Sequence, residues 1–177
     1  MTATSGRVAV ALLVALSLAV GATPAAAQSS DQPEWADDLF GELEEMQPRY
    51  NANVTETDMN FAERQVYNQL TGEVVNVYFV ETDVVFSFYM RRDGTIANLR
   101  QSGRNDADLK MEMTRETAEG LVERDDPVPP FVAAVNDGRV VQKNNPRIVR
   151  GIVISGENGK PIKQATWTVI NTLKGLA

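Results

Sequence analysis

Hydrophobic residues recur with two different spacings along this chain, and the spacing separates the expected helices from the expected strands. Intervals of three and four, which are typical of one helix face, occur first in the opening third of the chain. The residues on that face are Trp35, Leu39, Leu43 and Met46. Pro48 is expected to end this helix, because proline has no backbone N–H to donate. A second helix is predicted from a cap at Asp58 to a stop at Gly72.

The spacing changes to two between residues 75 and 113, which is typical of strands with one buried face. The apolar positions of this face are Val75, Val77, Phe79, Val84, Phe86, Phe88, Met90, Leu109, Met111 and Met113. Asp93-Gly94 is a strong signal for a two-residue hairpin, so the strands on either side of it are expected to pair. The prediction is an antiparallel meander of about three or four strands.

Helical spacing returns after these strands. Thr114 is predicted to cap a helix over residues 115–124, because its hydroxyl can accept a hydrogen bond from the first turn. Asp126-Pro127 is predicted to begin another helix that stops at Gly138, since proline is favoured in the first helical turn.

The last part of the chain mixes both patterns. A short strand is expected over residues 139–143, whereas residues 148–154 fit a strand or a helix equally well. Pro161 is predicted to begin a final helix. Its apolar side is made of Ile162, Ala165, Val169, Leu173 and Leu176. Together the elements predict one α+β domain over residues 28–177.

Residues 1–27 are predicted to be a secretory signal peptide and not part of the domain. Arg7 is the only charged residue there, an apolar run over residues 8–20 follows it, and a triplet of small alanines ends at Ala27. We expect cleavage after Ala27, which makes Gln28 the first residue of a secreted or cell-surface protein. A retained N-terminal anchor is the alternative, because about 20 apolar residues suffice to span a bilayer.

The composition excludes several kinds of chemistry. The chain of 177 residues contains no cysteine and no histidine, and its formal net charge is −7. It therefore cannot form a disulfide, a serine–histidine or cysteine–histidine nucleophile, or a zinc site of the common types. An acidic surface also disfavours nucleic acid. We expect a protein that is not an enzyme, needs no metal or cofactor and binds no nucleic acid.

Local motifs add little to this. Arginines around the Asp93-Gly94 hairpin could contact an anionic surface, and they also keep an edge hairpin soluble. A glycosylation sequon begins at Asn53 in a polar stretch. The paired acids and the glycines after residue 150 lack the spacing of a calcium loop or a phosphate loop.

The segment from Ala107 to Lys143 resembles the sterol-carrier-type, SCP2-like family of lipid-binding domains. The resemblance lies in the order of a strand that ends in threonine, a short helix, an acidic-proline break, a second helix, a glycine and a strand. In this sequence these parts read ADLKMEM, Thr114, RETAEGLVER, DDPVP, PFVAAVN, Asp137-Gly138 and RVVQK. The strands before this segment match the family's earlier strands in kind.

This resemblance implies an α+β fold in which an antiparallel or mixed sheet of about five strands is covered by helices on one side. Sheet and helices would enclose an apolar tunnel, with the last helix, residues 161–177, closing it. The implied ligand is an apolar molecule such as a sterol, an isoprenoid or a fatty acid, and transient contact with a membrane is compatible with this role. The residues expected to line the tunnel are Val77, Phe79, Phe86, Phe88, Met90, Met111, Met113, Leu121, Phe131 and Val135. The alternative is that this apolar face is a filled core, which would make the domain a cell-surface or extracellular interaction module.

Overall fold

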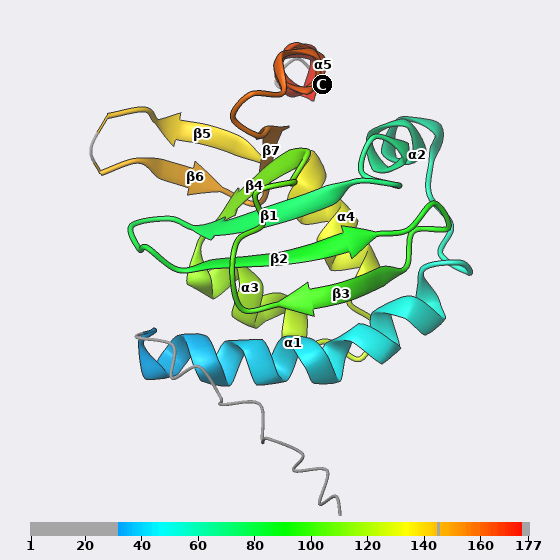
Figure 1. Cartoon of the computed structure of the whole chain (residues 1–177). Coiled ribbons are helices and arrows are strands. Elements are labelled where there is room, and N and C mark those ends of the chain that lie inside the picture. Colours follow the sequence, from blue (N-terminus) through cyan, green and yellow to red (C-terminus); the bar gives the residue numbers. More distant parts are fainter. Residues whose placement is uncertain (1–31, 145, 175–177) are drawn as a thin grey trace, which may run out of the picture. The chain divides into compact units, whose positions relative to one another are not determined.

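The computed structural model of the protein describes residues 32–144 and 146–174, which are drawn in colour in Figure 1. The predicted signal peptide and its cleavage site lie outside these residues. The helices of the described part are α1 (Glu34–Asn53), α2 (Phe61–Asn68), α3 (Arg115–Val122), α4 (Val128–Asn136) and α5 (Pro161–Lys174). Its strands are β1 (Val74–Phe79), β2 (Val85–Met90), β3 (Ile96–Arg100), β4 (Leu109–Met113), β5 (Arg139–Gln142), β6 (Ile148–Arg150) and β7 (Val153–Gly156). The predicted α+β class is confirmed.

Helix α1 continues through Pro48 to Asn53, so the prediction that this proline ends the helix is wrong. A proline inside a helix costs about 3 kcal/mol. The turn that follows gains tertiary contacts that offset this cost. Tyr50 is 1% exposed, and Asn51 bonds to both backbone groups of Ile96: its Oδ1 accepts from the N–H at 2.7 Å and its Nδ2 donates to the C=O at 2.9 Å.

The sequence pattern predicted that α2 begins after Asp58. The helix instead begins after Asn60. Asn60 Oδ1 accepts from the Glu63 N–H at 3.0 Å, and Glu63 Oε2 accepts from the Asn60 N–H at 2.9 Å. This reciprocal pair is a capping box. Asp58 cannot form one, because Phe61 and not a glutamate or glutamine lies three residues after it.

The two helix starts predicted after the strands are confirmed. Thr114 Oγ1 accepts from the Thr117 N–H at 3.1 Å and caps α3. Asp126 Oδ1 accepts from the Val128 N–H at 3.1 Å, immediately before α4. Each bond satisfies an N–H that has no partner inside its helix.

Five strands form one mixed sheet in the order β3-β2-β1-β4-β7. The predicted hairpin at Asp93 joins β2 to β3. Strand β4, however, runs parallel to β1, with Met111 beside Val77, so it does not extend an antiparallel meander. The segment between β3 and β4 crosses over the sheet (Figure 1), where Asn76 bonds to the backbone N–H and C=O of Arg104 at 2.8 and 3.0 Å.

The segment that fitted either a strand or a helix contains two strands separated by a bend. Strand β6 pairs with β5 in a separate two-stranded sheet, and β7 joins the main sheet beside β4. Gly151 lies between β6 and β7 with a φ of +61°. A Cβ at this position would lie 2.5 Å from the carbonyl oxygen of Ala134, so only glycine fits the bend without strain.

The main sheet has one apolar face, as the alternation predicted. Helices α1, α3 and α4 lie on that face, whereas the face toward the viewer in Figure 1 carries no helix. The buried apolar residues of β1, β2 and β4 are Val75, Val77, Phe79, Phe86, Phe88, Met90, Leu109, Met111 and Met113. The opposite face carries polar residues, among them Asn76 and Ser87, which are buried beneath the crossing segment.

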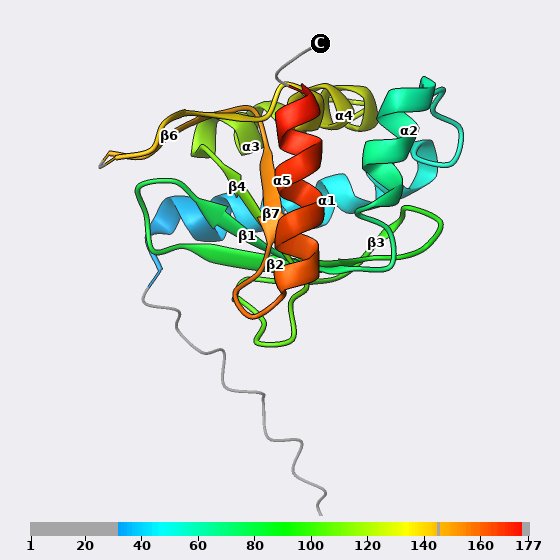
Figure 2. The same cartoon turned by 90° about the horizontal axis from the view of Figure 1, so that it is seen from above.

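Helix α5 packs along β7, the strand at one edge of the main sheet (Figure 2). Trp167 is its fully buried residue, and Asn171 Nδ2 donates to the carbonyl oxygen of Ile154 in β7 at 2.7 Å. These two contacts set the rotation of the helix about its own axis.

The rotation of α5 exposes the side that the sequence pattern predicted to be buried. Ile162 is 80% exposed and Val169 is 59% exposed. The large ring of Trp167 removes more apolar surface from water than this stripe of smaller side chains, which explains why it is turned inward. Leu176 and the side chain of Leu173 lie outside the described part of the chain.

Candidate functional site

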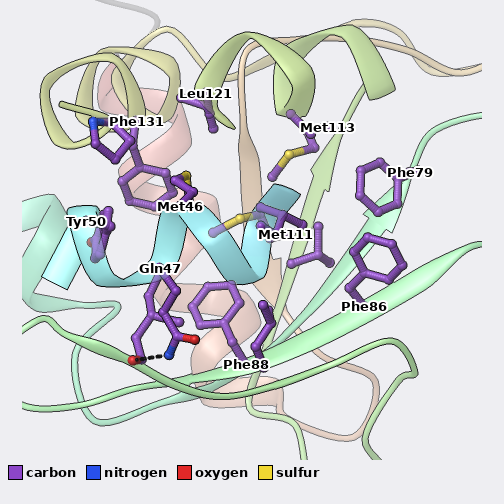
Figure 3. A pocket seen from close by; sticks show the side chains of 16 residues that line it. Met46, Gln47, Tyr50, Phe79, Phe86, Phe88, Met111, Met113, Leu121 and Phe131 are labelled. Carbon is purple, nitrogen blue, oxygen red and sulfur yellow. Dashed lines mark hydrogen bonds between the residues drawn. The ribbon is translucent and has the colours of Figure 1, made fainter. Parts of the chain in front are cut away.

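An apolar cavity of about 70 Å³ lies between the main sheet and helices α1, α3 and α4 (Figure 3). Its walls come from β1, β2, β3 and β4, from the three helices and from the turn before α4. The lining residues are Leu43, Met46, Gln47, Tyr50, Val77, Phe79, Phe86, Phe88, Ile96, Leu99, Met111, Met113, Ala118, Leu121, Pro127 and Phe131. No charged side chain is among these lining residues, so the space is suited to a hydrocarbon.

Aromatic rings form a rigid wall on one side of the cavity. Phe79 and Phe86 meet edge to face, with ring centroids 5.0 Å apart. Trp35 packs edge to face on Phe79 at 5.7 Å, and Phe40 packs on Phe86 at 5.3 Å. Each aromatic pair of this kind contributes about 0.5–1.5 kcal/mol of stability in addition to the contribution of its buried surface area. Helix α1 therefore supports this wall, since Trp35 packs on Phe79 and Phe40 packs on Phe86.

Three methionines form a part of the wall that can change shape. Met111 and Met113 come from β4, and Met46 comes from α1. They are closely packed, with exposed fractions of 1%, 4% and 7% respectively. A methionine side chain is unbranched and rotates about three bonds, so it can move aside without a shift of the backbone. The cavity can therefore enlarge on this side.

Gln47 and Tyr50 are the polar residues of the lining, and each donates a hydrogen bond within the protein. Gln47 Nε2 donates to the carbonyl oxygen of Ile96 at 2.7 Å. Tyr67 donates its hydroxyl proton to the carbonyl oxygen of Gly94 at 3.0 Å, so the Tyr50 hydroxyl donates to the Tyr67 oxygen, 2.6 Å away. Burial raises the pKa of Tyr50 well above its usual value and that of Tyr67 to about 12, so both phenols are neutral at physiological pH.

Most of the residues predicted to line an apolar site surround this cavity. They are Val77, Phe79, Phe86, Phe88, Met111, Met113, Leu121 and Phe131. Met90 does not reach it, because it lies fully buried at the far end of β2, where it pairs with Ile96 next to the hairpin. Val135 does not reach it either, because it lies on the side of α4 that faces α2 and lines a separate hollow of about 10 Å³.

The contribution of α1 to the cavity was missed. Leu43 and Met46 were placed on the apolar face of a helix, but not in the binding site. Gln47 and Tyr50 continue that face at helical spacing. The signal was therefore present in the sequence, and the expectation that Pro48 ends the helix concealed it.

The last helix does not close the cavity, contrary to what the family resemblance implied. No described residue of α5 lines it, and Trp167 is fully buried elsewhere in the protein. Helix α1 covers the cavity instead, with four residues in its lining. Trp35, and not Trp167, is consequently the tryptophan that adjoins the cavity wall.

Buried acidic side chains elsewhere are held in pairs with polar or basic partners. Glu157 Oε2 accepts from the Tyr78 hydroxyl at 3.0 Å and from Asn76 Nδ2 at 3.2 Å. Glu112 Oε2 accepts from Arg147 at 2.8 Å. Within the described residues, no acidic side chains are grouped so that they could hold a metal ion. No helix in this part of the chain has the length and apolar character needed to cross a membrane.

Comparisons with known proteins find likenesses among solved structures. No protein-family profile and no curated protein matches the sequence. The structure is similar to a solved chain described as "UbiJ-SCP2 Ubiquinone synthesis protein", with 10% sequence identity and a TM-score of 0.33 over 83% of this chain and 98% of that one. The ligand of this protein has to be inferred from its own cavity.

Proposed function

We propose that this domain binds an apolar, lipid-like molecule in the cavity between the main sheet and helices α1, α3 and α4. The observation that carries the proposal is the lining, in which every residue is apolar except Gln47 and Tyr50. Each of these two residues donates a hydrogen bond to another part of the protein. A buried water needs about two to four polar partners, so a space with these walls favours hydrocarbon over water.

Binding of a whole lipid requires the cavity to grow. The enclosed space of about 70 Å³ is smaller than typical ligand pockets of about 300–1,000 Å³. The methionines at 46, 111 and 113 are the side chains that can yield, because they are flexible and lie at the wall. We propose that the ligand's chain occupies the volume that these side chains vacate.

We further propose that the domain carries its ligand without chemical change and acts outside the cytoplasm. Acid–base catalysis needs a titratable side chain within reach of the ligand. Tyr50 is the titratable residue of the lining, and burial raises its pKa, so its phenol stays neutral. The absence of histidine and cysteine from the sequence supports the same proposal. Export is supported by the secretory pattern of residues 1–27.

Filling the cavity from within tests the proposal. Ala118 lines the cavity from α3 and is 2% exposed, so Ala118→Leu adds volume inside the space. Ligand uptake should fall by about tenfold or more, since pockets discriminate strongly against lost methylene-sized volume. Uptake can be measured by native mass spectrometry of the purified protein and by titration with the emission of Trp35, isolated by Trp167→Phe.

The matched control is Ala133→Leu, which makes the same change at an exposed position of α4 away from the cavity. This variant should take up ligand like the wild type. The proposal is wrong if purified protein yields no lipid on extraction and no apolar ligand changes the emission of Trp35 or the melting temperature.

A second function, that of an interaction module, is favoured by a different observation. Phe61 is 79% exposed and Val169 is 59% exposed, and both line an open groove of about 830 Å³ beside α2 and α5. Exposed apolar patches of this kind often mark contact surfaces. Phe61→Asp with Val169→Asp should abolish a partner contact and leave lipid uptake unchanged, whereas Ala118→Leu should do the reverse.

A further inference from the structure

The ring of Phe131 separates the apolar cavity from a second, smaller space. Phe131 lines both the cavity and the hollow of about 10 Å³ between α2 and α4. Tyr50 lines the cavity side of the same partition and Tyr67 lines the hollow side, and their hydroxyl oxygens are 2.6 Å apart. Figure 3 shows Phe131 and Tyr50 on one side of the cavity, with Phe79 and Phe86 on the opposite side. Phe131 and Tyr50 therefore form one end wall of the cavity.

The hollow behind this wall leads toward the surface of the protein. Three of its residues, Glu63, Val66 and Asn136, also line the open groove beside α2 and α5. The order from inside to outside is therefore cavity, Phe131, hollow and groove. Without the Phe131 ring, a hydrocarbon chain in the cavity could continue through the hollow into the groove. With the ring in place, the chain has to end at the ring.

Phe131 cannot move aside in the way that the methionines can. The hollow behind it holds about 10 Å³, which is space for about one water molecule and too small for an aromatic ring. On the cavity side, Tyr50 packs edge to face on Phe131, with ring centroids 5.9 Å apart. Tyr50 is itself held in place, because it is 1% exposed and its hydroxyl is bonded to that of Tyr67. The Phe131 ring is therefore confined on both sides.

The helix that carries Phe131 is also fixed. The carbonyl oxygen of Ala134 accepts from the Ile152 N–H at 2.8 Å, and the carbonyl oxygen of Val135 accepts from Lys174 Nζ at 2.6 Å. These donors belong to the segment before β7 and to α5, so both bonds would break if α4 withdrew from the cavity. Because unmade hydrogen bonds of buried groups are costly, α4 keeps its place.

From these contacts we infer that Phe131 is the stop that limits the length of the hydrocarbon chain that the domain accepts. The inference rests on the proposed function and narrows its ligand class to molecules whose chain ends inside the cavity. The methionine walls yield and let the cavity widen, whereas the end at Phe131 stays closed. Carbon atoms beyond the available length gain nothing, because they remain in water.

A series of straight-chain primary alcohols, from 1-hexanol to 1-hexadecanol, tests the inference on the purified protein. Each added CH₂ should tighten binding by about fourfold while the chain is buried in the cavity. At the length that fills the cavity this gain should stop, and we call this length the break. Binding is measured through the emission of Trp35, isolated by Trp167→Phe. A gain that continues up to 1-hexadecanol would overturn the inference.

Phe131→Ala then asks whether this residue sets the break. The variant opens the cavity to the hollow, so two carbon atoms beyond the wild-type break should tighten binding by about fifteenfold, whereas they add nothing in the wild type. Phe131→Leu removes less of the side chain and costs less stability, so it keeps the inference testable if Phe131→Ala does not fold. It should give a smaller gain in the same direction.

Phe88→Ala is the matched control, because Phe88 lines the cavity but not the hollow. Val66→Phe distinguishes the two deletions, since Val66 lines the hollow and the groove but not the cavity. In the Phe131→Ala protein, Val66→Phe should obstruct the hollow and return the break toward its wild-type position. In the Phe88→Ala protein and in the wild type, the same substitution should leave the break unchanged. Equal effects of Val66→Phe in all three proteins would contradict the inference.

The outcomes separate the inference from the proposed function. If the alcohols bind without a break, or with a break that the Phe131 variants leave in place, the inference is wrong and the proposed function stands. If no alcohol of the series binds to protein that melts cooperatively, the proposed function fails together with the inference.

Discussion

The cavity and the junction of α4, β7 and α5 are both buried, but they differ in how much added volume they can accept. The cavity leaves about 70 Å³ between side chains. We define the junction by Gly138, Gly151, Gly156 and Trp167. There, a Cβ on Gly138 would lie 1.8 Å from the carbonyl oxygen of Ile152, and a Cβ on Gly156 would lie 2.3 Å from the backbone nitrogen of Gln164.

The difference follows from which atoms make the contact. The cavity is bounded by side chains, and some of these, such as the methionines, can rotate away from a ligand. At the junction, backbone packs against backbone, and a hydrogen-bonded strand or helix cannot shift to admit a carbon atom without losing those bonds. We expect the molecule to change shape at the cavity and to keep its shape at the junction.

The largest effect should come from adding one carbon atom at the junction. Gly138→Ala places its Cβ 1.8 Å from a backbone oxygen, so unfolding free energy should fall by about 3 kcal/mol or more. Gly41→Ala is the control, since nothing lies within 4 Å of its Cβ in α1. It should stabilise the protein by about 0.5–1 kcal/mol, because alanine is the better helix former. Equal stability of the two variants in urea unfolding would contradict the comparison.

A large deletion at the cavity should destabilise the protein in a way that a ligand can reverse. Phe88 is 6% exposed, so Phe88→Ala should lower the unfolding free energy by about 3–5 kcal/mol. An apolar ligand that enters the added space should restore part of this loss by mass action. Phe61→Ala, at a position that is 79% exposed, should change stability by less than about 0.5 kcal/mol. A loss at Phe88 that no ligand reduces in thermal melts would favour a filled core.

The two regions should also respond oppositely to high pH. At the junction, burial lowers the pKa of Lys174 from 10.5 to about 8. Between these values the unfolded chain binds more protons than the folded chain, so the unfolding free energy should rise as the pH increases from about 8 to 10.5. Next to the cavity, the pKa of Tyr67 is raised from 10.0 to about 12, so stability should fall as the pH rises from 10 toward 12.

Urea unfolding between pH 7 and pH 12, at intervals of about half a unit, measures both trends. Lys174→Met should remove the rising part of the profile, and Tyr67→Phe should weaken the falling part. A profile of Lys174→Met that still rises above pH 8 would show that burial of this amine is not its cause.

The smallest effect on stability should come from filling the cavity. Ala118→Leu adds side-chain volume where space exists, so the unfolding free energy should change by less than about 1 kcal/mol or increase. The matched control is Ala36→Leu, because Ala36 is fully buried in α1 and does not line the cavity. Overpacking there should cost about 1–3 kcal/mol. Equal losses for both variants would mean that the space does not accept a side chain.

Features that depend on neighbours in the chain could be predicted from the sequence. The alternation of apolar residues gave the buried face of β1, β2 and β4, and the hairpin at Asp93 joined the expected strands. Thr114 and Asp126 occupied their predicted places before α3 and α4. Each of these signals acts within a few residues, where the local backbone geometry leaves few alternatives.

Features that depend on distant parts of the chain were decided by packing. Helix α1 passes through Pro48 because Tyr50 and Asn51 find partners on β3 and α2. Strand β4 lies parallel to β1 after a segment that crosses the sheet, and Asn76 of β1 bonds to that segment at Arg104. Helix α5 turns Trp167 inward and leaves Ile162 and Val169 in solvent.

The candidate site shows the same division. The sequence by itself determined which strand residues form an apolar surface, since the period of two assigns each side chain to one face. Only the tertiary structure decided that α1 covers this surface and that Met90 and Val135 lie outside the cavity. The reason is that the cavity is the space left over when side chains from seven elements pack together. Its size and position depend on all seven elements at once, so no local sequence pattern can predict them.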